Sequence, residues 1–146
     1  MPIGDNPINR KEVRKALAAG LSASMPTAQA VYGYQKSDFG QQSPVVRVYS
    51  SGAERPSMTA KGIRSKFFFT VEVWVLFGKR AAWSEEDAED AIDTLEQELI
   101  AWIADNQVTA WWTHLEYARP SLMGVVTVGG MQYLVEEFSV AAQVYG

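Results

Sequence analysis

The stretch from Lys66 to Phe77 limits the fold more than any other part of the chain. Its residues alternate between two sets, and both sets contain large apolar side chains. One set is Phe67, Phe69, Val71, Val73, Val75 and Phe77, and the other is Phe68, Thr70, Glu72, Trp74 and Leu76. Alternation with a period of two predicts a strand, and a stripe of apolar side chains is unfavourable in water. We therefore expect a sheet whose two faces are both covered.

A first helix is predicted over residues 10–23. Asn9 and Glu12 have the spacing of a capping box, and apolar residues then recur at intervals of four. Pro26 favours an end at Met25, because the residue before a proline resists helical geometry.

A second, acidic helix is predicted after Ser84, which is a favourable N-cap residue, and it should end at Asp105 and Asn106. An apolar stripe at helical spacing comprises Ala88, Ala91, Ile92, Leu95, Leu99, Trp102 and Ile103. Each large member would contribute about 1.5 to 3 kcal/mol on burial, so this stripe should anchor the helix to the sheet.

The remaining segments complete a fold of the α+β class. We expect strands at 28–34, 45–49 and 110–118 and a long C-terminal strand at 133–145. We also expect a turn at 37–43, a long loop at 50–63, a strand end at Arg119-Pro120, and a second loop around Gly124 to Gly130. Helices and strands do not alternate strictly, which favours a mostly antiparallel sheet of about five strands with two helices packed on one face. A length of 146 residues fits a single domain over residues 1–146.

Composition excludes several classes of protein. The chain has no cysteine, which fits a reducing compartment such as the cytoplasm. A net charge of -4 argues against general affinity for nucleic acid. Charged residues interrupt the first twenty positions, and no apolar run approaches the roughly 20 residues of a membrane span. We expect neither a secretion signal nor contact with a membrane.

No pattern in the sequence indicates catalysis. His114 is the only histidine, so a histidine metal cluster is impossible and a Ser-His-Asp triad would depend on this one residue. The acidic run after Ser84 lacks the spacing of a calcium loop, and Gly124 to Gly130 lacks the lysine of a phosphate loop. We predict no catalytic, metal or cofactor site and no enzyme activity. A ligand-binding or enzymatic domain with a pocket near His114 is the alternative.

Charge instead favours assembly. The first helix carries a basic face and the second an acidic one, and two such faces can meet head to tail between subunits and close a ring. The candidate interface residues are Arg10, Lys11, Arg14 and Lys15 of the first helix, Glu85, Glu86, Glu89 and Asp90 of the second, Arg55 and Lys61 in the long loop, and Phe68 and Trp74 on the second sheet face.

The order of these elements resembles that of the tail terminator, or tail completion, proteins of long-tailed bacteriophages and prophages. The resemblance covers the first helix, the hairpin from Val45 to Phe77, the acidic helix after Ser84 and the alternating strand from Tyr133 to Tyr145. It implies a homo-oligomer, a hexameric ring that caps the tail tube and binds a head-side neck protein. It also implies that DNA passes through the ring without specific binding. The protein would belong to the virion tail or neck and assemble in the host cytoplasm. Another neck or minor tail protein fits the same resemblance.

Reversing the charges of Arg10, Lys11, Arg14 and Lys15 should abolish ring formation, because the acidic helix of the neighbour would then face like charge. Size-exclusion chromatography with light scattering at low salt measures this. A fourfold variant that assembles like the wild type would contradict helix-to-helix pairing.

Overall fold

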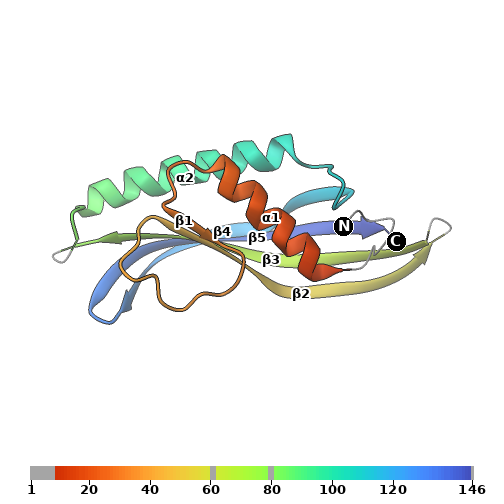
Figure 1. Ribbon diagram of the computed structural model, residues 1–146, viewed down its shortest axis with the longest axis horizontal. Coiled ribbons are helices and arrows are strands. Elements are labelled where there is room, and N and C mark those ends of the chain that lie inside the picture. Colours follow the sequence, from red (N-terminus) through yellow and green to blue (C-terminus); the bar gives the residue numbers. More distant parts are fainter. Residues whose placement is uncertain (1–8, 60–61, 79–80, 146) are drawn as a thin grey trace.

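The structure is a computed structural model that describes residues 9–59, 62–78 and 81–145, and only the backbone of residues 55–59 and 62–63. Its elements are α1 (Arg10–Ser24), β1 (Ala30–Tyr32), β2 (Val45–Thr59), β3 (Gly62–Phe77), α2 (Glu85–Asp105), β4 (His114–Val128) and β5 (Met131–Tyr145). One sheet has the strand order β1-β2-β3-β5-β4, in which β1 and β2 are parallel and the other pairs antiparallel. Both helices lie on one face of it (Figure 1). The predicted α+β class and architecture are confirmed.

The core lies between the helices and the central strand β3. The predicted set from Phe67 to Phe77 faces the helices and is buried. Against it pack Val13, Leu17 and Leu21 of α1 and Ile92, Leu95 and Leu99 of α2. Every second side chain of β3 thus packs against the apolar stripes of the helices, which recur about every 3.6 residues, in a single core.

Local chemistry fixes both helix starts. The Asn9 side chain accepts a hydrogen bond from the Glu12 amide at 3.1 Å, and Ser84 and Asp87 form a reciprocal capping box.

Further along α1, Gly20 lies against the Trp102 ring of α2. A Cβ atom added at Gly20 would come within 2.2 Å of Trp102 Cζ2. The helices approach this closely because residue 20 has no side chain.

The second face of the sheet is covered by the chain itself at one end. The segment 33–44 places Phe39 over Trp74, with ring centroids 5.2 Å apart, and beside Tyr133 at 6.1 Å. Arg47 lies 4.9 Å from the Trp74 ring centroid and forms an ion pair with Glu72. The second apolar face of the sheet, which the sequence predicts to be covered, is therefore covered in part by the chain's own segment 33–44.

The predicted loop at 50–63 is wrong over its described residues. β2 continues to Thr59 and β3 starts at Gly62, and the two strands pair along this stretch. Register shifts between Ser50 and Gly52 and between Glu54 and Ser57 interrupt the alternation. Bulges insert extra residues into a strand, so the pattern with a period of two disappears from the sequence although the pairing continues.

The predicted strand end at Arg119-Pro120 is also wrong. β4 begins at His114, later than the predicted Ala110, and runs through a bulge at this proline to Val128. A two-residue turn, Gly129-Gly130, then leads into β5, and both glycines have positive φ. Proline is tolerated here because β4 lies at the sheet edge and the proline falls in a bulge.

Neither helix within the described ranges is long and apolar enough to cross a membrane.

Replacing Phe39 with alanine should reduce the free energy of unfolding by about 3 kcal/mol, because it removes a buried ring and leaves Trp74 and Tyr133 uncovered. Urea denaturation followed by tryptophan fluorescence measures the change. Tyr34→Ala is the control: Tyr34 lies in the same segment but is 54% exposed, so its loss should stay within about 0.5 kcal/mol. Equal effects of the two substitutions would contradict the covering role of Phe39.

Candidate functional site

The outer half of β4, from Leu122 to Val128 beside the turn to β5, is an exposed apolar strand edge. Its large apolar residues are Leu122 (60% exposed), Met123 (53%), Val125 (57%), Val126 (37%) and Val128 (44%). We call this set the β4 edge patch. β4 is the last strand of the sheet, so one side of its backbone has no strand partner within the described chain. An edge that is both long and apolar is a template for pairing with another chain.

A bulge separates this patch from the inner half of β4. Register shifts lie between Tyr117 and Arg119 and between Arg119 and Leu122. They bring Ser121 next to Glu136 of β5, whose carboxylate accepts a hydrogen bond from the Ser121 hydroxyl at 2.7 Å. Bulges commonly redirect side chains beside functional surfaces.

Glu136 is 5% exposed and stands between Leu134 and Phe138 in the otherwise apolar row of β5 that faces the helices. Burial raises its pKa, and the carboxylates of Glu96 and Asp93 on α2 raise it further, while the Ser121 hydrogen bond lowers it. Carboxyl groups of α2 and β5 therefore lie close together near the bulge of β4, beside the Arg119 side chain.

A notch of about 340 Å³ lies between α2 and β4 at this bulge. Its lining residues are Glu96, Ile100, Tyr117, Ala118, Arg119, Pro120, Ser121 and Phe138. Ile100 and Tyr117 are each about 40% exposed and supply apolar surface, while Glu96 supplies negative charge. We call it the α2–β4 notch.

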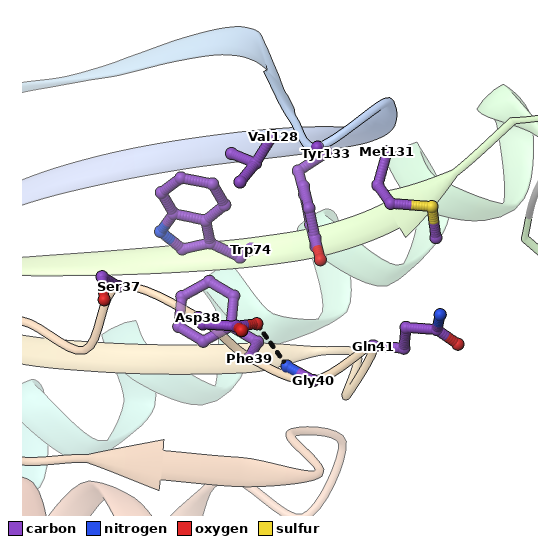
Figure 2. A pocket seen from close by; sticks show the side chains of 10 residues that line it. Ser37, Asp38, Phe39, Gly40, Gln41, Trp74, Val128, Met131 and Tyr133 are labelled. Atoms are coloured by element: carbon purple, nitrogen blue, oxygen red, sulfur yellow. Dashed lines mark hydrogen bonds between the residues drawn. The ribbon is translucent and has the colours of Figure 1, made fainter.

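A second cavity, of about 460 Å³, lies on the opposite face between the segment 33–44 and the β4–β5 turn (Figure 2). Aromatic rings of Phe39, Trp74 and Tyr133 form much of its wall, and Val128 of the β4 edge patch lines its rim. Asp38 accepts a hydrogen bond from the Gly40 amide at 2.9 Å and so closes a turn. Burial, and to a lesser extent Asp38, raises the pKa of Tyr133. This cavity is an aromatic packing surface that continues from the β4 edge patch.

The basic residues predicted on the first helix lie on the surface of α1. Arg10, Lys11 and Lys15 are exposed, whereas Arg14 is half-buried and its Nε donates to the Gly33 carbonyl at 2.9 Å. Gly33 directly follows β1, the edge strand opposite β4. The basic face thus lies at the β1 side of the molecule.

The predicted acidic residues Glu85, Glu86, Glu89 and Asp90 are exposed on α2. That helix holds nine Asp and Glu residues and no Lys or Arg. In the described part of the chain, no ion pair joins α2 to α1. One copy therefore presents both charged faces outward, and their role as an interface stays a prediction.

The other predicted interface residues have different surroundings. Trp74 is buried under Phe39 and leaves little surface for a partner, while Phe68 is half-buried. Arg55 has only a described backbone in β2, and Lys61 lies outside the described residues.

His114 belongs to a small cluster of charged side chains. Its Nε2 lies 3.3 Å from Glu116 Oε2, and Lys66 Nζ lies 3.6 Å from Glu116 Oε1. Exposed pairs of this kind contribute at most about 1 kcal/mol. The two cavities described above are lined by other residues. Within the described ranges no group of three or more His, Asp or Glu is placed to hold a metal ion.

Sequence reasoning missed the β4 edge patch; it placed Glu136 on one face of the last strand with Leu134 and Phe138 but did not single it out as a buried carboxylate. The signals were present: an apolar run follows Pro120, and a single carboxylate interrupts the alternating apolar row of the last strand. The glycines and the proline made the first look like a loop, although glycine and proline also occur at bulges and hairpin turns.

Comparison with known proteins gives no family assignment. No family model matches the chain, and no curated protein matches it. One similar solved structure is a chain of the virion of a native gene transfer agent particle. It shares 16% sequence identity and a TM-score of 0.46, over 93% of this chain and 92% of that one.

Replacing Glu136 with glutamine should stabilise the fold more at neutral than at acidic pH. A carboxyl group whose folded-state pKa is raised contributes stability below its unfolded value near 4.5, and this contribution is lost as the pH rises through the folded pKa. Urea denaturation at about pH 4.5 and pH 7.5 measures the difference between variant and wild type. Glu86→Gln, an exposed matched control, should stay within about 0.5 kcal/mol at both values. An advantage of Glu136→Gln that shrinks toward neutral pH would contradict the burial argument.

Proposed function

We propose that this protein is a structural component of a bacteriophage or prophage tail, a tail terminator that assembles into a ring. The ring caps the tail tube and presents a surface to a head-side neck protein. Two lines of reasoning support this. The element order resembles that of tail terminators, and the β4 edge patch supplies a surface suited to joining protein chains.

The β4 edge patch carries the proposal. Five large apolar side chains project from one half of an edge strand, on both of its faces. Monomeric proteins usually protect such edges with charges, short strands or covering segments. Burying such side chains fully contributes about 1.5 to 3 kcal/mol each, so covering the patch with a partner chain would be strongly favourable.

The proposed mechanism is steric and interfacial. Copies join edge to edge, and the long β2–β3 hairpin reaches toward the tube or a neighbouring subunit. The many carboxylates of α2 give the ring an acidic character, which lets DNA pass without adhering if they face the channel. As an alternative, the protein is another neck or minor tail protein, which would form a ring by the same contacts at a different level of the tail or neck. A ligand-binding or enzymatic domain would instead be a monomer or dimer.

Light scattering coupled to size exclusion, followed by negative-stain imaging, tests assembly directly. The wild type should form closed rings, alone or on purified tail tubes. Leu122→Lys combined with Val126→Lys should prevent rings, because two ammonium groups would have to be buried in the joint. Both positions are exposed, so circular dichroism and thermal unfolding should match the wild type.

Val108→Lys combined with Gln97→Lys is the matched control. Both residues are exposed and lie outside the β4 edge patch, Gln97 on α2 and Val108 just after it, and this pair adds the same charge. It should form rings like the wild type. A wild-type chain that forms no ring either alone or on tubes, or a β4 double variant that still forms rings, would refute the proposal.

A further inference from the structure

The two edge strands, β1 and β4, lie at the same level along the strand direction. Register partners connect Ala30 of β1 through Val45, Trp74 and Val135 to Gly124 of β4 in one row across the sheet. The exposed half of β4 is therefore level with the opposite edge strand, β1. Since β4 runs antiparallel to β2, and β1 runs parallel to β2, a second copy in the same orientation would bring its β1 antiparallel to β4.

The helix layer is incomplete above β4. α1 contacts β1 and β2, and α2 contacts β3 and β5, so the two helices occupy the β1 side and the centre of the sheet. The α2–β4 notch lies on the far side of α2. Glu89, Asp93, Glu96 and Ile100 follow at helical spacing along this flank of α2.

Charge decides which surface can cover the notch. Glu96 lines the notch and Asp93 lies one turn before it on α2, and both are close enough to Glu136 to raise its pKa. The cation of the lining, Arg119, is paired with Glu137. A two-fold arrangement would place one acidic wall against another, which is repulsive. A head-to-tail arrangement brings the α1 face of the next copy instead, and that face carries Lys11 and Lys15 exposed one turn apart.

We infer that the α2–β4 notch is the docking site for the basic face of α1 from the next copy. The aliphatic stems of Lys11 and Lys15 cover Ile100 and Tyr117, while their ammonium groups meet Asp93 and Glu96. Residues one helical turn apart on each side give matching spacing. The inference rests on the proposed self-assembly and specifies its joint: heterologous, between two different surfaces, and so able to close a ring.

A charge swap tests this joint in the full-length chain. Lys11→Glu with Lys15→Glu, and separately Asp93→Lys with Glu96→Lys, should each weaken self-association about tenfold or more, as like charges then face each other. Mixing the two variants should restore assembly, because every contact of an alternating ring regains opposite charges. Native mass spectrometry of the mixture should show equal numbers of both chains.

Thr94→Lys combined with Ala101→Lys and Asp105→Lys, three exposed positions of α2 outside the candidate interface and the notch, is the matched control. It makes the same change in net charge on the same helix. It should assemble like the wild type. Equal loss in this control, or no restoration in the mixture, would overturn the inference while leaving ring formation by another joint intact.

Disulfide trapping gives a second measurement, because the chain has no cysteine of its own. Lys15→Cys combined with Glu96→Cys should give disulfide-linked oligomers after mild oxidation, whereas Lys15→Cys with Ala101→Cys, on another side of α2, should give at least tenfold less. Absence of linked oligomers from the first pair, under conditions where wild-type rings form, would overturn the joint. Linked oligomers without closed rings would support the joint and reject the tail-terminator ring.

Discussion

The central strand β3 determines the rest of the architecture, because both of its faces must be removed from water. One face is satisfied by the two helices, and the other by Phe39 and its segment at one end of the sheet. These covers reach the middle of the sheet and the β1 side, but the outer half of β4 lies beyond them (Figure 1). The outer half of β4 is thus exposed because neither the helices nor the segment around Phe39 extends over it.

The two kinds of charge lie toward opposite edges of the sheet. The basic helix stands over the β1 side of the sheet, and the flank of the acidic helix lines the opposite side. Salt will weaken contacts between such exposed charges, whereas the apolar surface of the β4 edge patch is insensitive to that screening. Apolar burial then supplies the strength of a joint and charge supplies its orientation, a division seen widely in protein interfaces.

Sequence patterns predicted the helices, their caps and the central strand, because each of these has a strong local signal. They failed where strands contain bulges. Pro56 and Pro120 each lie within a register shift on a long strand, whereas proline in a sequence more often indicates a loop or a strand end. The charged helix residues of the candidate interface were predicted from the sequence; the structure places the acidic ones and three of the four basic ones on the surface, and their role stays a prediction. Glu96 in the notch and Asp93 beside it were not assigned to an interface, because only the packing of α2 against β4 distinguishes that flank from the remainder of an acidic helix.

The contact between Gly20 and Trp102 has a consequence for geometry on a larger scale. It fixes how far the basic helix stands from the acidic one within a single copy. In the proposed head-to-tail joint, that separation contributes to the spacing between the two charged surfaces that one copy presents to its two neighbours. The interior of one subunit thus bears on the surface it would offer to its neighbours, because a methyl group at position 20 would have to displace the Trp102 ring.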